Sequence, residues 1–164
     1  MSDRRVVTIG VYGFDAPRFL DALREAEVRL LVDVRQRRGV RGAAYAWANS
    51  RRLQAALADA GIEYEHRPEL APTTELRQLQ YAEDARQGVG KRSRSELAPA
   101  YIERYTRERL DVVDLEALVA DLPSDGATAL LCVERDPEAC HRSIVAARME
   151  ADHGVRLAHL RPQA

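Results

Sequence analysis

The chain has 164 residues, of which 46% are hydrophobic and 31% charged, and its formal net charge is −1 at pH 7. This composition is typical of a globular domain and excludes a disordered chain. Because 25 basic residues nearly balance 26 acidic ones, overall charge gives no reason to expect nucleic-acid binding. The first residues lack an apolar signal core, no apolar run is long enough to span a membrane, and two cysteines suit a reducing compartment. We therefore expect a cytoplasmic protein.

The N-terminal part of the chain predicts two buried strands with a helix between them. Residues 5–13 are β-branched and apolar and end in a glycine turn, which is typical of a strand. The helix over residues 15–28 has Asp15 as its N-cap and Pro17 in its first turn. Residues 29–35 predict a second strand, too continuously apolar to alternate, as expected of a parallel strand covered on both faces.

A loop rich in glycine and arginine follows over residues 36–50. Asn49 or Ser50 then caps a helix that stops at Gly61, and residues 62–67 predict a third strand. Residues 68–121 are helical in character, a stretch longer than one crossover between strands requires. We expect part of this stretch to pack over the end of the sheet as a lid or a subdomain.

The C-terminal part predicts a strand over residues 127–134, a helix over about 137–152 that stops at Gly154, and a short strand over 155–160. The alternation of strands and helices predicts a single α/β domain over residues 1–164. It has a mainly parallel sheet of about five strands flanked by helices, with a helical insertion at about 68–121.

Polar side chains gather after the predicted strands, where ligands of open parallel sheets bind. We expect a site at this edge. Its candidate catalytic residues are Asp33, Cys140 and His141, and its candidate substrate-binding residues are Tyr12, Arg35, His66, Glu134 and Arg142.

The segment Cys140–His141–Arg142 has two interpretations. In the first, Asp136 caps a helix that has Pro137 at its first position, and Cys140 faces the core. In the second, residues 136–139 form a tight turn and the helix begins nearer His141. The three side chains then surround free backbone N–H groups that can bind an anion and lower the pKa of a thiol.

The sequence resembles the Domain of Unknown Function 488 family, and the resemblance covers nearly the whole chain. The matching motifs are TIG (8–10), LVDVR (31–35), AGIEYEHRPEL (60–70), YIERYTRERL (101–110) and LLCVERDPEACHRS (130–143). The last motif is the most specific. The resemblance implies the fold and the location of the site; it supplies no reaction, and the cofactor is unknown.

Four functions compete. The first is binding of, or action on, an anionic substrate, such as a phosphorylated compound, a nucleotide or a nucleic-acid end, through Arg35, Arg142 and the arginines of the loop. The second is a thiol-dependent enzyme with Cys140 as nucleophile. The spacing does not fit a cysteine followed by five residues and an arginine, because Ala146 stands at that position.

The third function is a metal site using Cys132, Cys140, His141 and His66. Their spacing lacks the short pairs that make zinc assignments from sequence strong, so we assign no metal ligand. The fourth is a non-catalytic nucleic-acid binder, in which Tyr45, Trp47 and the basic segment 90–94 contact bases and phosphates. Substrate, reaction and oligomeric state do not follow from the sequence.

Overall fold

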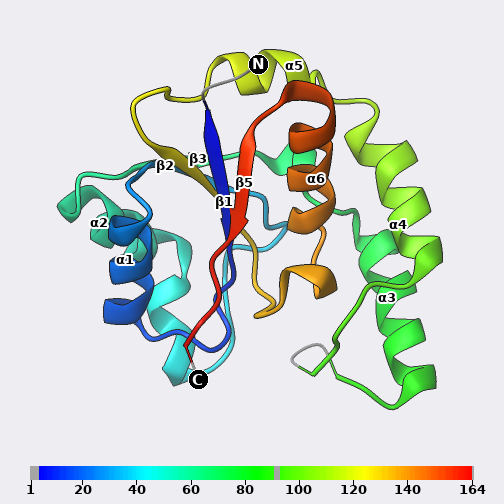
Figure 1. Ribbon diagram of the computed structural model, residues 1–164. Coiled ribbons are helices and arrows are strands. Elements are labelled where there is room, and N and C mark those ends of the chain that lie inside the picture. Colours follow the sequence, from blue (N-terminus) through cyan, green and yellow to red (C-terminus); the bar gives the residue numbers. More distant parts are fainter. Residues whose placement is uncertain (1–3, 91–92, 164) are drawn as a thin grey trace.

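A computed structural model describes residues 4–90 and 93–163 of the chain (Figure 1). In this part of the chain five strands form one parallel sheet in the order β3-β2-β4-β1-β5. The strands are β1 (Arg5–Ile9), β2 (Val28–Asp33), β3 (Glu63–His66), β4 (Ala127–Leu131) and β5 (Arg156–His159). The predicted parallel α/β fold is confirmed.

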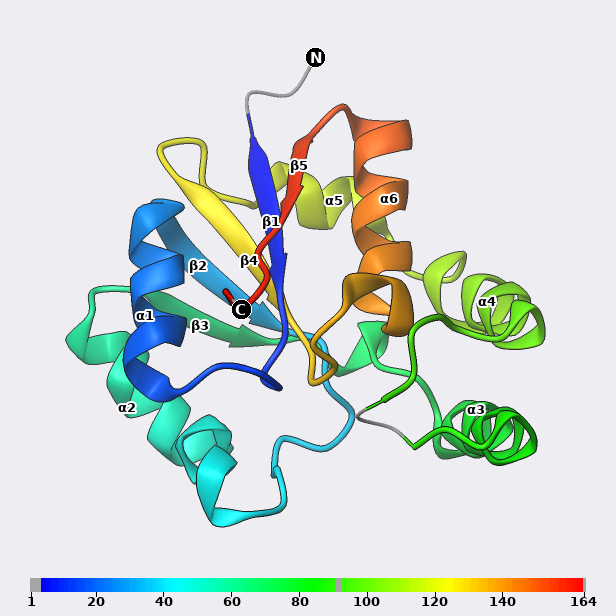
Figure 2. The same ribbon diagram turned by 60° about the horizontal axis from the view of Figure 1, so that its bottom comes forward.

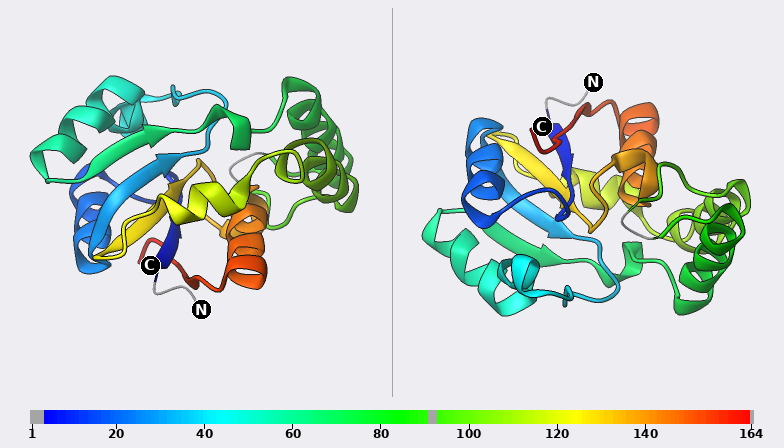
Figure 3. Two further views of the ribbon diagram at one scale, coloured as in Figure 1. Left: turned by 90° about the horizontal axis from the view of Figure 1, so that it is seen from above. Right: turned by 90° about the horizontal axis from the view of Figure 1, so that it is seen from below.

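Helices cover both faces of the sheet. Helices α1 (Ala16–Glu25) and α2 (Ser50–Asp59) lie on one face, and α6 (Arg142–His153) lies on the other with α5 (Leu115–Ala120) packed against it (Figure 1). Views along the sheet from above and below show the same separation (Figure 3). Covering both faces explains why β2 and β4 read as continuous apolar runs.

The helical insertion between β3 and β4 is also confirmed. Helices α3 (Thr74–Gln87) and α4 (Pro99–Tyr105) pack on each other beside the sheet, near the end where the strands point (Figure 2). A π-helical turn, Thr106–Leu110, continues α4. The Tyr105 hydroxyl donates to the Leu70 carbonyl at 2.6 Å and fixes this unit to the chain that leaves β3. None of the helices in the described ranges is long and apolar enough to cross a bilayer.

Helix ends follow the predicted signals. Asp15 caps α1 by accepting a hydrogen bond from the Arg18 backbone N–H at 2.9 Å. Gly154 ends α6 in a left-handed conformation, with φ of 68°. Asn49 precedes α2, but its side chain accepts from the Val40 backbone N–H at 2.6 Å, so it orders the preceding loop.

The strands are shorter than predicted, because the chain leaves the ladder where the site begins. Beyond Ile9, the backbone N–H groups of Val11 and Tyr12 both donate to the Val133 carbonyl, each at 3.0 Å. These bonds join two loops outside the sheet, so β1 and β4 end at Ile9 and Leu131.

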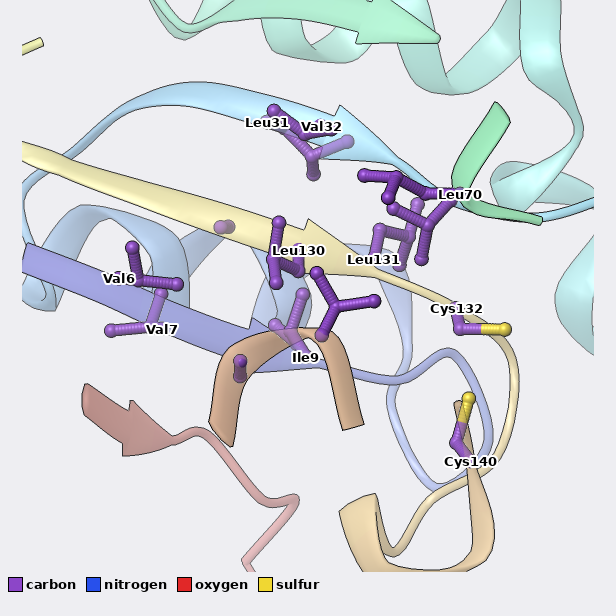
Figure 4. Packing of buried hydrophobic residues seen from close by; sticks show 14 of the residues in the cluster. Val6, Val7, Ile9, Leu31, Val32, Leu70, Leu130, Leu131, Cys132 and Cys140 are labelled. Atoms are coloured by element: carbon purple, nitrogen blue, oxygen red, sulfur yellow. The ribbon is translucent and has the colours of Figure 1, made fainter. Parts of the chain in front are cut away.

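The buried core runs along the central strands β2, β4 and β1 (Figure 4). Strands β2 and β4 are parallel neighbours, with Asp33 opposite Leu131. The segments that follow these two strands therefore leave the sheet at the same edge. The carboxyl edge of the sheet is where polar residues from distant parts of the sequence meet.

Candidate functional site

A cleft of about 730 Å³ opens at the carboxyl edge of the sheet. One wall is the loop after β2, and the opposite wall is α3 with the segment that leads to α4. Its floor is formed by the chain after β4, including Cys132, Cys140 and His141. The cleft has the size of a small-molecule site.

The turn and the helix start of the second interpretation of the Cys140–His141–Arg142 segment are confirmed, while Arg142 is fully buried and the anion-binding role of this end stays a prediction. Pro137–Ala139 forms one 3₁₀ turn, and α6 begins at Arg142 with His141 before it. Proline favours such a turn because its φ is fixed. Cys140 therefore precedes the helix and lines the cleft, although its side chain is only 2% exposed.

Two cysteines and one histidine meet on the floor. Cys132 Sγ and Cys140 Sγ each lie 3.7 Å from His141 Nδ1. The three ligand atoms all lie within 4.8 Å of one another, and Figure 4 shows the two cysteine side chains next to each other beyond the end of β4. His141 Nε2 lies 2.8 Å from the Val34 carbonyl, to which it can only donate. This bond fixes the orientation of the ring and its tautomer.

The three groups have opposed pKa shifts. Burial raises the pKa of the Cys132 thiol well above its ordinary value, and its contact with Cys140 adds to this. Burial also acts to raise the pKa of Cys140, but the hydrogen bond from Cys132 and the charge of His141 outweigh it and hold that pKa well below its ordinary value. For His141, burial acts to lower the pKa, while Cys140 and the bond to Val34 raise it. The pKa values of the two thiols are therefore shifted in opposite directions, and that of His141 is raised.

Asp33 and Arg35 form a buried pair with each other. Arg35 donates through Nε and Nη2 to the two carboxylate oxygens of Asp33, at 2.9 and 2.7 Å, and through Nη1 to the Ala48 carbonyl at 2.9 Å. Tyr64 donates to the same carboxylate at 2.6 Å. Burial opposes the charge of Arg35, but Asp33 raises its pKa. Arg35 borders the cleft, Asp33 does not, and both use their charge within the protein.

Arg142 lies behind the floor. Its side chain is fully buried and donates to the backbone carbonyls of Glu134 and Arg135, at 2.7 and 3.2 Å. Gly10 makes this packing possible, because a Cβ at that position would lie 1.9 Å from the Glu134 carbonyl oxygen. The glycine of the TIG motif and the arginine of the Cys-His-Arg motif therefore hold one turn together, and Arg142 does not line the cleft.

The other predicted site residues divide between the cleft and its surroundings. Tyr12 and Glu134 line the cleft. His66 does not, and its Nε2 lies 3.1 Å from the Arg35 carbonyl. Trp47 packs against Phe19, with ring centroids 4.9 Å apart. Tyr45 packs against Tyr12. In the basic segment 90–94, Lys91 and Arg92 lie outside the described residues.

Two arginines of the insertion between β3 and β4 (residues 68–121, called the lid below) were not among the expected catalytic or substrate-binding residues, although Arg94 belongs to the basic segment 90–94. Arg94 is buried and donates to Asp84 of α3 at 2.7 Å and to Glu134 at 2.8 Å. Arg77 of α3 lines the cleft and donates to Gln36 at 2.7 Å and to the Tyr81 hydroxyl at 2.9 Å. Both belong to the insertion. In the sequence they look like ordinary surface charges of a helical stretch, so only the folded lid identifies them.

Fold and site together define a parallel α/β protein with a Cys-Cys-His cluster on the floor of an arginine-lined cleft. Residues 15–149 match the family model described as Domain of unknown function DUF488. The chain belongs to this family, and the predicted resemblance is confirmed. Comparison with curated proteins and with solved structures gives no match.

Proposed function

We propose that the chain is an enzyme that binds an anionic, phosphorylated small molecule in the cleft and acts on it at the Cys-Cys-His floor. One observation carries the proposal: arginines that lack a neutralising carboxylate line the same cleft as this cluster. Arg35 and Arg94 are compensated by buried acids. Among the described residues of the lining, Arg37 and Arg77 have no carboxylate within ion-pair distance.

The arrangement of these arginines suits an anion. Arg77 is half-buried and is held by Gln36 and Tyr81, so its guanidinium loses little freedom when a ligand binds. Arg37 is exposed on the opposite wall. Guanidinium groups bind phosphate oxygens through paired, charge-assisted hydrogen bonds. Tyr12, Tyr81 and Tyr101 also line the cleft, and a nucleotide is one candidate substrate within the phosphorylated class.

The test is ligand-induced thermal stabilisation with inorganic phosphate and nucleoside monophosphates. A ligand at 100 times its Kd stabilises the folded chain by about 2.7 kcal/mol, a shift in Tm of roughly 5–10 °C for a chain of this size. The variants Arg37→Ala and Arg77→Ala should each weaken binding about tenfold. Arg51→Ala removes an exposed arginine of α2 outside the cleft and is the matched control.

Two outcomes would contradict the proposal. One is the absence of any shift in the unmodified chain. The other is steeply salt-dependent binding of single-stranded oligonucleotides without a response to phosphate or nucleotides, which would make the chain a nucleic-acid binder. Variants of Arg35 and Arg142 are less useful here, because both side chains are buried and bonded to groups of the protein, so their loss would disturb the fold.

The contact between Cys140 and His141 supports a second candidate, a thiol-dependent enzyme with Cys140 as nucleophile. Iodoacetamide should then alkylate Cys140 faster than it alkylates a free thiol at neutral pH. Alkylation no faster than that of the free thiol would exclude this candidate.

A further inference from the structure

We propose that Cys132, Cys140 and His141 form a zinc site whose fourth position opens into the cleft. The inference deepens the proposed function and rests on it, because the metal would lie on the floor of the cleft that holds the anionic substrate. It assigns the three side chains a joint role that neither anion binding nor thiol chemistry explains.

The two sulfur–nitrogen distances fit tetrahedral coordination. Both sulfur atoms lie 3.7 Å from His141 Nδ1, and all three atoms fall within 4.8 Å of one another. With zinc–sulfur bonds of about 2.3 Å and zinc–nitrogen bonds of about 2.0–2.1 Å, neighbouring sulfur and nitrogen ligands of a tetrahedral site are about 3.6 Å apart. Two separate distances therefore agree with the edges of one tetrahedron.

The imidazole is oriented as a metal ligand. His141 donates Nε2–H to the Val34 carbonyl at 2.8 Å, so the lone pair of the neutral ring is on Nδ1 and faces the sulfurs. Histidines that bind metals usually donate their other ring N–H to such a carbonyl. Both cysteine sulfurs lie at the same distance from Nδ1, so the ring faces the two of them equally. A metal ion between the three atoms would use all of them.

Charge and burial favour a divalent ion of soft character. Two thiolates and a neutral imidazole around Zn²⁺ have zero net charge, so the buried cluster would leave no uncompensated charge. The cluster is buried against the rest of the protein but lines the cleft. Three protein ligands with one open position are typical of catalytic rather than structural zinc. The open position would take water or an oxygen of the substrate.

Glu134 supports the cluster from outside. Its Oε2 lies 3.9 Å from Cys132 Sγ, and Arg94 holds the other oxygen at 2.8 Å. Glu134 does not belong to the set of atoms within 4.8 Å of one another, so we assign it as a neighbour and not as a ligand. With zinc bound, Cys140 is a ligand and no longer an attacking nucleophile, so this inference replaces the second candidate above.

The test measures metal in the full chain, purified without chelators after expression with zinc. About one zinc ion per chain is expected by elemental analysis. The Cys132→Ser and Cys140→Ser variants should lose it. His66→Gln is the matched control, because His66 is bonded to the Arg35 carbonyl away from the cluster and its loss should leave zinc content unchanged. Replacing zinc by Co²⁺ in the unmodified chain should give thiolate-to-cobalt charge-transfer bands, a readout that does not depend on a variant folding.

Zinc at background level, together with no cobalt bands in the folded, unmodified chain, would overturn the inference. The failure of the proposed function looks different. Arg37→Ala and Arg77→Ala should keep zinc while losing phosphate affinity, and a chain that binds phosphate but no metal would refute the metal site alone. A chain that holds zinc but gives no response to phosphate or nucleotides would refute the anionic substrate alone.

Discussion

Arg94 donates to Glu134 at 2.8 Å and to Asp84 at 2.7 Å, and so joins the helical lid to the floor of the cleft. Its third contact is the Ala139 carbonyl at 3.3 Å, just before Cys140. Gln80 extends the network by donating to Asp84 at 2.8 Å. Together with the bond from Tyr105 to Leu70, this buried guanidinium therefore holds the lid against the floor of the cleft.

We predict that Arg94→Ala lowers the free energy of unfolding by about 3–5 kcal/mol, because it leaves two buried carboxylates without their cation. Urea unfolding measures the loss, and faster hydrogen exchange in α3 and α4 should locate it in the lid. Arg104→Ala is the matched control. The ion pairs of Arg104 with Glu75 and Glu108 are largely at the surface. The variant should therefore lower the free energy of unfolding by no more than about 1 kcal/mol. Equal losses of unfolding free energy in the two variants would show that Arg94 does not hold a buried network together.

Asp33→Asn should destabilise the chain by about 3–5 kcal/mol, because Arg35 would lose its buried partner. The anion affinity of the folded fraction should change little, since Asp33 does not line the cleft. The control is Asp125→Asn, which removes the carboxylate from an exposed pair with Arg29. If Asp33→Asn abolishes ligand binding but leaves the free energy of unfolding unchanged, the Asp33–Arg35 pair has a direct role at the site.

Gly10→Ala should lower the free energy of unfolding by at least about 1–3 kcal/mol, because the added Cβ would lie 1.9 Å from the Glu134 carbonyl oxygen. The shift of that turn should also lower the metal content of the neighbouring cluster. Gly39→Ala provides the comparison: its nearest neighbour would be the Asn49 Oδ1 at 3.9 Å, an ordinary contact. An unchanged unfolding midpoint in Gly10→Ala would show that the turn can move freely.

Stability should depend on pH through His159. Burial lowers its pKa, and the charges of Arg142 and Arg161 add to this. The folded state therefore binds this proton less readily than the unfolded state, so the stabilisation is complete above the unfolded pKa of about 6.5 and is lost as the pH falls through the folded pKa. Unfolding measured between pH 8 and pH 5 should lose stability more steeply in the unmodified chain than in His159→Gln. Parallel curves would contradict the assignment.

The sequence predicted the parallel sheet, the insertion and the edge at which the cleft opens, because these depend on local patterns and on a general rule for parallel sheets. It also predicted the alternative in which α6 begins near His141. What it could not predict was which charged residues are satisfied internally. Asp33 and Arg35 stand two positions apart after a strand, as many active-site pairs do, but Tyr64 and the Ala48 carbonyl complete their hydrogen bonds from other elements.

The positions of the two cysteines and of Arg94 in the lid could not be predicted from the sequence either. Cys132 and Cys140 are separated by a turn whose path sets the distance between the sulfurs, and residue spacing alone does not determine that path. Arg94 belongs to a segment that reads as basic and exposed, yet its side chain is buried because α3 and the chain after β4 place carboxylates on both sides of it.

The position of β4 between β2 and β1 has a consequence for how the chain folds. β1 pairs only with β4 and β5 among the described strands, and both come from the last 40 or so residues. While the ribosome is still making the insertion, β2 can pair with β3, but β1 has no strand to join. We expect the nascent chain to hold an open edge until residue 131 has emerged, which makes this interval the one in which aggregation competes most strongly with folding.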